Sequence, residues 1–287
     1  MSTSPQKKEN ANTYFVQDKQ LKEELVRLTL QDHLLTTSMG GVLPEQTDPS
    51  IFQRVLDIGS GSGSWIIEAA RTYPAMSLVG IDINPGMAEY ASAQAHKHGL
   101  SERVTFQVMD ALKKLEFPDA SFDLVNLRFG ISYLRTWDWP ELLSEMVRIL
   151  HPGGVVRLTE PEVIQISNSP AHMKLQDMLQ CAFYKSGHLF ENESAGLTAH
   201  LANFLKRYGL RQVQTKDYAL EYKAGTTEGQ TYYKDNAHAM STGRPYLAKW
   251  GRLDASYDTL CQQALKEMQQ SDFHATWKLT TAWGTKP

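Results

Sequence analysis

The chain has 287 residues, of which 41% are hydrophobic and 21% charged, and its formal net charge is −3. This composition is that of a globular protein, and the balance of charge favours neither nucleic acid nor an anionic membrane as a partner. No apolar run approaches the roughly 18 residues that membrane insertion requires. Two isolated cysteines, Cys181 and Cys261, indicate neither a disulfide framework nor a metal site. With the polar N-terminus, they predict a cytoplasmic protein.

The N-terminal fifty residues predict a leader, a helix and a linker. Residues 1–12 are polar and are expected to be disordered. From residue 13 to about 39, leucines recur at steps of three and four, which indicates an amphipathic helix. Gly40 and Gly41 end it, and a linker runs to residue 50. We interpret residues 13–50 as a cap over a ligand, closed by Tyr14 or Phe15; the alternative is a helix that only packs on the domain edge.

The most informative stretch follows directly. Residues 55–58 are apolar except for Asp57, and Gly59, Gly61 and Gly63 come next, before an apolar helical pattern that begins near residue 65. A strand, a glycine-rich turn and a helix together bring a ligand against bare backbone and a helix N-terminus. Glycines alone also fit a tight turn that binds nothing.

The details of this turn favour one class of ligand. A dinucleotide site has the pattern G-x-G-x-x-G, whereas Ser64 stands where its third glycine would fall. A carboxylate at Asp57 would repel a pyrophosphate and attract an ammonium group. S-adenosylmethionine carries an ammonium group and no phosphate, so the sequence favours it over a dinucleotide.

Two further acids follow two further predicted strands. Asp82 ends the strand at residues 76–82, about 20 residues past the glycine turn, the spacing at which a carboxylate meets ribose hydroxyls. Asp110 follows the strand at 103–108, where it could accept from an adenine amino group while the N–H of Ala111 serves a ring nitrogen. Each acid alone could be a solvated loop residue. Three acids at three successive strand ends indicate a binding site.

The remaining strands of the first half predict an α/β fold. A fourth strand ends at Asn126, a loop at residues 128–134 follows it, and a helix at 138–150 leads to a fifth strand at 155–160. Five strands alternating with helices imply a mostly parallel sheet that is covered on both faces. Open sheets of this kind bind ligands at the carboxyl ends of their strands, where the loop at 128–134 lies.

These residues resemble the class I S-adenosylmethionine-dependent methyltransferases, which have a Rossmann-like fold. The resemblance covers residues 52–161, and its closest branch is that of the ubiquinone, menaquinone and secondary-metabolite methyltransferases. It rests on the motifs VLDIGSGSG (55–63), GIDIN (80–84), VMDA (108–111), SFDLV (121–125) and ILHPGG (149–154). It implies a three-layer α/β sandwich with a seven-stranded, mostly parallel sheet whose last strand is antiparallel.

The resemblance also implies roles for matching residues. Asp57, with the backbone of the turn, would hold the methionine part of S-adenosylmethionine, and Asp82 would bind both ribose hydroxyls. Asp110 would read the adenine edge. With Tyr14 of the cap included, the residues expected to bind the cofactor are Tyr14, Asp57, Gly59, Ser60, Gly61, Asp82, Ile83, Met87, Asp110, Ala111, Asn126 and Leu127. One departure is that Leu127 and Arg128 replace the two prolines that follow the Asn or Asp in some amino-methyltransferases, which argues against methylation of DNA bases or glutamine of that type.

The second half of the chain carries weaker signals. Residues 51–161 are the predicted cofactor-binding core, 162–208 form lid helices, and 209–287 form the last strands, interrupted by a helical insertion at about 224–271. We expect one structural domain overall. Aromatic and methionine side chains in the lid and the insertion suggest an apolar acceptor pocket, although such side chains more often serve packing.

The acceptor side of the site is predicted only in outline. Methyl transfer needs a general base only where the acceptor must lose a proton. His188 is the first candidate for this catalytic role, followed by His238 and Glu160, and each also fits a structural role. Arg128 and Tyr133 are expected to line the pocket, because their loop lies at the ligand edge, and Glu160 and His238 are the other residues expected there. The sequence contains no recognisable metal-binding pattern, and none is predicted.

Three functions remain open from the sequence. The first is a methyltransferase that transfers a methyl group to a small aromatic, quinone or secondary-metabolite acceptor and releases S-adenosylhomocysteine. The second is an enzyme of changed chemistry, such as a cyclase or decarboxylase, and the third is a sensor or partner-binding protein without catalysis. We expect a monomer or homodimer with a small-molecule acceptor, no nucleic-acid partner and no membrane insertion.

Overall fold

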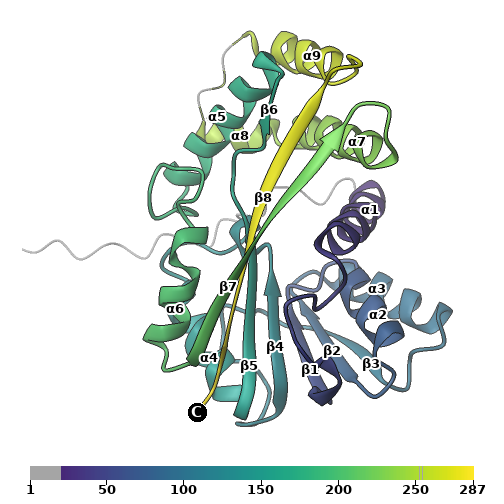
Figure 1. The fold of residues 1–287 in the computed structure, drawn as a ribbon, viewed down its shortest axis with the longest axis vertical. Coiled ribbons are helices and arrows are strands. Elements are labelled where there is room, and N and C mark those ends of the chain that lie inside the picture. The colour runs from purple at the N-terminus through teal and green to yellow at the C-terminus, as the bar shows by residue number, and fades with distance from the viewer. Residues whose placement is uncertain (1–20, 252, 254) are drawn as a thin grey trace, which may run out of the picture.

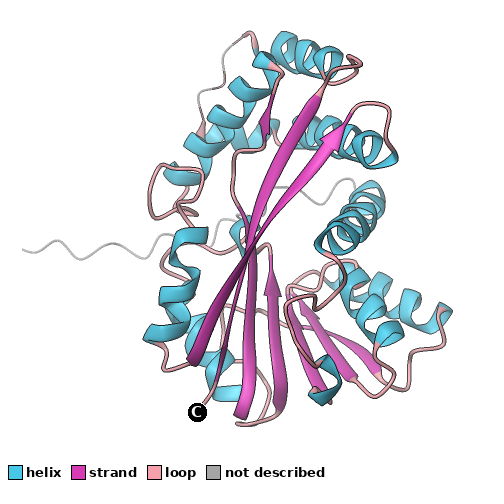
Figure 2. Ribbon diagram, viewed as in Figure 1, coloured by secondary structure: helices cyan, strands magenta, loops and turns pink. Residues whose placement is uncertain are grey.

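The computed structural model describes residues 21–287 except 252 and 254. One mixed sheet of eight strands forms its centre, with helices packed around it (Figure 2). The strands run in the order β3-β2-β1-β4-β5-β8-β6, and β7 pairs with β8. The predicted α/β class with a Rossmann-like, mostly parallel sheet is therefore confirmed.

The parallel half of the sheet follows the predicted alternation of strands and helices. Its strands are β1 (Arg54–Ile58), β2 (Ser77–Asp82), β3 (Val104–Val108), β4 (Phe122–Arg128) and β5 (Leu150–Pro161). Its helices are α2 (Ser64–Thr72), α3 (Pro85–Lys97) and α4 (Trp139–Ile149). The chain order of the strands reverses between β1 and β4, which is the point where open α/β sheets bind ligands.

Alternation along the central strands divides the core between two faces. Leu56 and Ile58 pack with α4, whereas Val55 packs with Trp65 and Ile66 of α2. All five side chains are at most 2% exposed. Burial on both faces explains why these strands are apolar nearly throughout, so a polar residue within them requires a buried partner.

The antiparallel half contains one strand more than expected. The last strand, β8 (His274–Thr285), runs antiparallel to β5 and to β7 (Arg211–Lys223), as predicted. The short additional strand β6 (Ile166–Ser167) pairs with the beginning of β8, beyond the point where β5 ends. β5 ends opposite Leu279, so the first residues of β8 offer unpaired backbone groups to the segment that follows β5.

The upper part of the hairpin extends beyond the parallel sheet into a region of helices (Figure 1). These are α5 (Pro170–Lys185), α7 (Thr227–Thr242), α8 (Arg244–Trp250) and α9 (Tyr257–Glu267), and α6 (Leu201–Arg207) packs lower down on β7 and β8. The predicted insertion at 224–271 thus contains three helices. None of the described helices is long and apolar enough to cross a membrane.

Helix α1 (Leu21–Met39) connects the two parts of the molecule. It packs on α2 of the parallel half and on α7 and β7 of the upper region (Figure 1). Arg27 pairs with Asp235 of α7 at 2.7 Å, and Gln31 donates to the same carboxylate at 2.9 Å. The predicted helix is confirmed from residue 21 onward; its first residues, Tyr14 included, lie outside the described part of the chain.

The start of α2 shows why a glycine is required there. Gly63, the residue before the helix, has a left-handed backbone with φ of 74°. A Cβ atom at this position would lie 2.6 Å from the Phe106 ring and 2.8 Å from the Cβ of Ala91. Helix α2 therefore approaches β3 and α3 more closely than any other residue would allow.

This close approach makes a stability prediction. Gly63→Ala should lower the free energy of unfolding by about 1–2 kcal/mol for the left-handed backbone and by a further 1–3 kcal/mol for overpacking. Gly209→Ala is the matched control, because Gly209 has φ of 83° and no atom within 4 Å of its added Cβ. Equilibrium urea denaturation measures both, and equal losses would contradict the packing argument.

Candidate functional site

The glycine turn lies at the carboxyl end of β1, where the sequence predicts the cofactor. Gly59, Gly61 and Gly63 all have positive φ, of 69°, 52° and 74°. The Ser60 N–H donates to the Ile81 carbonyl of β2 at 2.9 Å, which fixes the turn to the neighbouring strand. The Ser60 hydroxyl is buried and has no hydrogen-bond partner among the described residues. A buried unpaired donor beside bare glycine backbone suits a polar ligand.

Asp82 contacts the turn directly. The Gly61 N–H donates to Asp82 Oδ2 at 2.9 Å, and the Asn84 N–H donates to Oδ1 at 2.9 Å. Burial raises the pKa of Asp82, against the effect of these two donors. The two carboxylate oxygens keep further acceptor capacity, because each has more than one lone pair. Asp82, about 20 residues past the glycine turn in the sequence, thus contacts that turn through its carboxylate.

The other predicted adenine-site residues surround the ends of β2 and β3. Ile83 follows β2 directly and is 65% exposed, so its side chain is available to an apolar ligand face. Met87 lies in the first turn of α3 and is buried. Asp110 accepts from the Leu112 N–H at 2.9 Å, and its neighbour Ala111 is partly buried. Their cofactor-binding roles stay predictions.

A row of polar side chains crosses the three central strands. Asp57 of β1, Asn126 of β4 and Arg157 of β5 occupy neighbouring register positions, so their side chains share one face of the sheet. Asn126 Nδ2 donates to Asp57 Oδ1 at 2.7 Å, and Arg157 Nη1 donates to Asn126 Oδ1 at 2.9 Å. Arg157 Nε donates to Glu45 Oε1 of the linker at 2.7 Å. We call these four residues the polar row.

The polar row is almost wholly buried. Asp57 is 4% exposed, Asn126 0% and Arg157 1%, and the Glu45 side chain is 0% exposed. Burial raises the pKa of Asp57 to about 7; the Asn126 hydrogen bond and the Arg157 charge oppose the rise, and the Asp82 charge adds to it. Burial tends to raise the pKa of Glu45, but the charge of Arg157 and its hydrogen bond outweigh burial. The pKa of Glu45 therefore lies below its usual value.

The sequence motifs indicate Asp57 and Asn126 but neither Arg157 nor Glu45. A signal was present, because Arg157 is the one charged residue among the apolar positions 155–158 of a central strand. Such a charge requires a buried partner of opposite sign. Nothing in the sequence indicates that the partner is Glu45, since the two are 112 positions apart.

Arg128 lies on the same face of β4 but is engaged by α1. It forms an ion pair with Asp32 and lies over the Trp65 ring, 5.7 Å from its centroid. Burial lowers its pKa to about 9, and the Arg157 charge contributes. Arg128 therefore ties the cap helix to the end of β4. The side chain of Leu127, by contrast, points into the core, so only its backbone could meet a ligand.

The loop after β4 brings Tyr133 to the glycine turn. A Cβ at Gly59 would lie 2.6 Å from the Tyr133 hydroxyl oxygen. Glu160 of β5 holds this loop by accepting from the Gly130 N–H at 2.6 Å and the Ile131 N–H at 3.0 Å. Burial raises the Glu160 pKa to about 8, against these two donors. Glu160, expected to line the acceptor pocket, thus anchors the loop that carries Tyr133.

The two predicted histidines lie in other parts of the fold. His188 follows α5; its Nδ1 lies 2.7 Å from the Leu134 carbonyl, and its ring packs on Phe183. Burial lowers the pKa of His188 to about 4, which makes it a weak general base at neutral pH. His238 is partly buried on α7. The catalytic role of His188 and the pocket role of His238 stay predictions.

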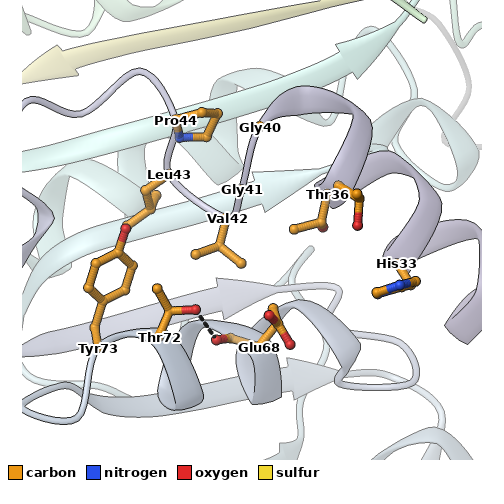
Figure 3. Close-up of a pocket in the computed structure, with 11 residues that line it drawn as sticks. His33, Thr36, Gly40, Gly41, Val42, Leu43, Pro44, Glu68, Thr72 and Tyr73 are labelled. Carbon is orange, nitrogen blue, oxygen red and sulfur yellow. Dashed lines mark hydrogen bonds between the residues drawn. The ribbon is translucent and has the colours of Figure 1, made fainter. Parts of the chain in front are cut away.

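Two cavities flank the contact between α1 and α2. The larger, of about 210 Å³, lies between the end of α1, residues 40–44 and the side chains of Glu68, Thr72 and Tyr73 (Figure 3). The second, of about 180 Å³, reaches the glycine turn at Ser62 and Ser64. Neither is lined by Asp57 or Asn126. Among the described residues, no group of three His, Cys, Asp or Glu side chains is placed to hold a metal.

Sequence comparison agrees with this geometry. A family model described as a methyltransferase domain matches residues 55–154. A demethylmenaquinone methyltransferase of Deinococcus radiodurans is 41% identical over 108 residues, which are 38% of this chain and 43% of that protein. The aklanonic acid methyltransferase DauC of Streptomyces sp. (strain C5) is 37% identical over 129 residues, 44% of this chain and 56% of that protein. The chain thus matches about half the length of these relatives.

Solved structures extend the similarity to the whole fold. The phosphoethanolamine N-methyltransferase 2 of Haemonchus contortus, in complex with S-adenosyl-L-methionine, aligns with a TM-score of 0.54 at 23% identity. The alignment covers 94% of this chain and 59% of that one. The [4+2]-cyclase SpnF aligns with a TM-score of 0.50 at 19% identity, covering 95% and 98%. At these identities the likeness is one of fold. The resemblance inferred from the sequence is confirmed: residues 55–154 match a methyltransferase domain, and the chain shares the Rossmann-like fold of these structures.

Proposed function

We propose that the chain is an S-adenosylmethionine-dependent methyltransferase that acts on a small organic acceptor. The observation that carries the proposal is the contact of Asp82 with the Gly61 N–H, next to the buried Asp57, within a methyltransferase domain. Two carboxylates at the strand ends suit a ligand with an ammonium group and a free ribose. The same two carboxylates would repel the phosphates of a dinucleotide.

Each part of the site has a proposed task. Asp57, oriented by Asn126, would attract the ammonium group, and the Ser60 hydroxyl and the glycine backbone would supply hydrogen bonds. Asp82 would accept from both ribose hydroxyls, while Asp110, Ala111 and Ile83 would enclose the adenine, next to Met87. S-adenosylmethionine supplies a methyl group on a positively charged sulfur, and its transfer by in-line displacement leaves S-adenosylhomocysteine.

The acceptor would lie between the end of β4 and the upper region. Tyr133, held beside Gly59, and Arg128, held by Asp32, would form one wall of its pocket, and α1 would cover it. Alignment of the two reactants can supply much of the acceleration in such a transfer. The relatives named for demethylmenaquinone and aklanonic acid support an aromatic or quinone-like acceptor. A cytoplasmic monomer or homodimer without nucleic acid remains part of the proposal.

The role of Asp82 makes a prediction about ribose recognition. The wild-type protein should bind S-adenosylhomocysteine more tightly than its 2′-deoxyribose analogue. Asp82→Asn should weaken the binding of S-adenosylhomocysteine by about tenfold and so reduce the difference in affinity between the two ligands. Isothermal titration calorimetry measures the four affinities. Asp123→Asn is a suitable control, because Asp123 accepts from the Gln53 and Arg54 N–H groups away from the glycine turn. An undiminished preference in Asp82→Asn would contradict the placement.

The pKa of Asp57 predicts the pH dependence of binding. Only the ionised carboxylate attracts an ammonium group, and burial raises its pKa to about 7. Affinity for S-adenosylhomocysteine should therefore be retained just above this pH and fall by about tenfold per pH unit below it. Calorimetric titration at a series of pH values gives the midpoint of this decline. A constant affinity down to about pH 5 would exclude an ionised Asp57 as the ammonium site.

Catalysis itself is tested with methyl-labelled S-adenosylmethionine and a panel of phenols, amines and quinones. Transfer of label to an acceptor is the expected result. Binding of S-adenosylmethionine without transfer to any acceptor would favour a sensor or an enzyme of changed chemistry, and failure to bind it would refute the proposal. Analysis of the incubated acceptors by mass spectrometry also detects a cyclised or decarboxylated product.

A further inference from the structure

We propose that Arg157 is a positioning residue for the methyl-donor site: it fixes the Asn126 amide and favours the ionised form of Asp57, with Glu45 of the linker as its counter-charge. The inference rests on the proposed function, because it assigns Asp57 to the ammonium group. Arg157 itself does not reach the glycine turn through any hydrogen bond of the structure, and it acts through Asn126.

Arg157 fixes the orientation of the Asn126 amide. A side-chain amide can face either way, and its two ends have opposite hydrogen-bonding character. Arg157 can only donate, so its Nη1–H requires the oxygen of Asn126, which directs Nδ2 to Asp57. The Asp57 carboxylate is then held at Oδ1, and Oδ2 accepts no hydrogen bond from the described residues. Arg157 thus decides which atom of Asp57 remains for a ligand.

The charge of Arg157 also acts on the ionisation of Asp57. Asp57 is 4% exposed, and a buried carboxyl group without a nearby cation favours the neutral form. The charged groups that act on it are Asp82 of β2, which opposes ionisation, and Arg157 of β5, which favours it. Glu45 sits on the far side of Arg157 and offsets part of its charge. The ionisation of Asp57 therefore depends on the balance within the polar row.

Nearby charges outside the row are already paired. Arg128, two residues beyond Asn126 on β4, forms its ion pair with Asp32 of α1. The carboxylate of Asp82 accepts from two backbone N–H groups, and its pKa is set by burial and by these donors. A change at Arg157 should thus act first on Asp57 and leave the two hydrogen bonds of Asp82 in place.

The inference makes opposite predictions for two substitutions. Arg157→Met removes the cation and should move the pH midpoint of S-adenosylhomocysteine binding upward by about one unit or more. Glu45→Gln removes the counter-charge and keeps a hydrogen-bond acceptor for Arg157, so the midpoint should move downward. If Arg157 has only a structural role, Arg157→Met and Glu45→Gln should both lower stability, and their pH midpoints of binding should not shift in opposite directions.

Direct titration of Asp57 gives a readout that does not depend on the ligand. The carboxyl carbon chemical shift of Asp57, followed by NMR against pH in the protein alone, should move in the same two directions. Arg157→Lys keeps the charge and should largely restore the wild-type midpoint, although a lysine cannot reproduce the two-sided contact with Asn126 and Glu45. If Arg157→Met does not fold, Glu45→Gln and Arg157→Lys still test the proposal.

Arg148→Met is the matched control. Arg148 of α4 also bonds two carboxylates, Glu145 and Asp119, but no member of the polar row. Its loss should lower stability and leave the binding midpoint in place. Unchanged midpoints in both polar-row variants, or shifts of the same sign, would overturn the inference. If the wild-type protein binds no S-adenosylhomocysteine at any pH, the proposed function fails, and the NMR titration still decides whether Arg157 controls Asp57.

Discussion

The structure depends on one buried chain of polar contacts across the centre of the sheet. Asp57, Asn126, Arg157 and Glu45 bring two carboxylates and one guanidinium into the buried centre of the sheet. Buried charges are tolerated only when they are paired and hydrogen-bonded. Each member of the row therefore constrains the others, and the register of β1, β4 and β5 must hold for any of them to be satisfied.

This constraint also connects the linker to the strands that carry Asp57 and Asn126. Glu45 belongs to the segment between α1 and β1, and its pairing with Arg157 fixes that segment against the sheet. Helix α1, which the linker follows, is held independently by the Arg128–Asp32 pair and by Arg27 with Asp235 of α7. The cap thus has polar attachments to the glycine-turn side and to the upper helices.

The two halves of the sheet differ in what they present. The parallel half presents the glycine turn and the acids at the strand ends, which are the parts that the domain family matches. The long β7–β8 hairpin extends beyond these ends, and α5, α7, α8 and α9 lie around its upper part (Figure 1). The family model matches residues 55–154, so these upper helices, and with them much of the proposed acceptor side, lie outside the matched domain.

The sequence by itself determined the fold class, the strand–turn–helix at Gly59 to Gly63 and the acids Asp57, Asp82 and Asp110, because these are local patterns with fixed spacings. Only the tertiary structure decided that Arg157 and Glu45 complete the row, that Glu160 anchors the Tyr133 loop and that β6 extends the sheet. These contacts join residues as many as 112 positions apart. Strand register and loop packing set such contacts, and a linear pattern specifies neither.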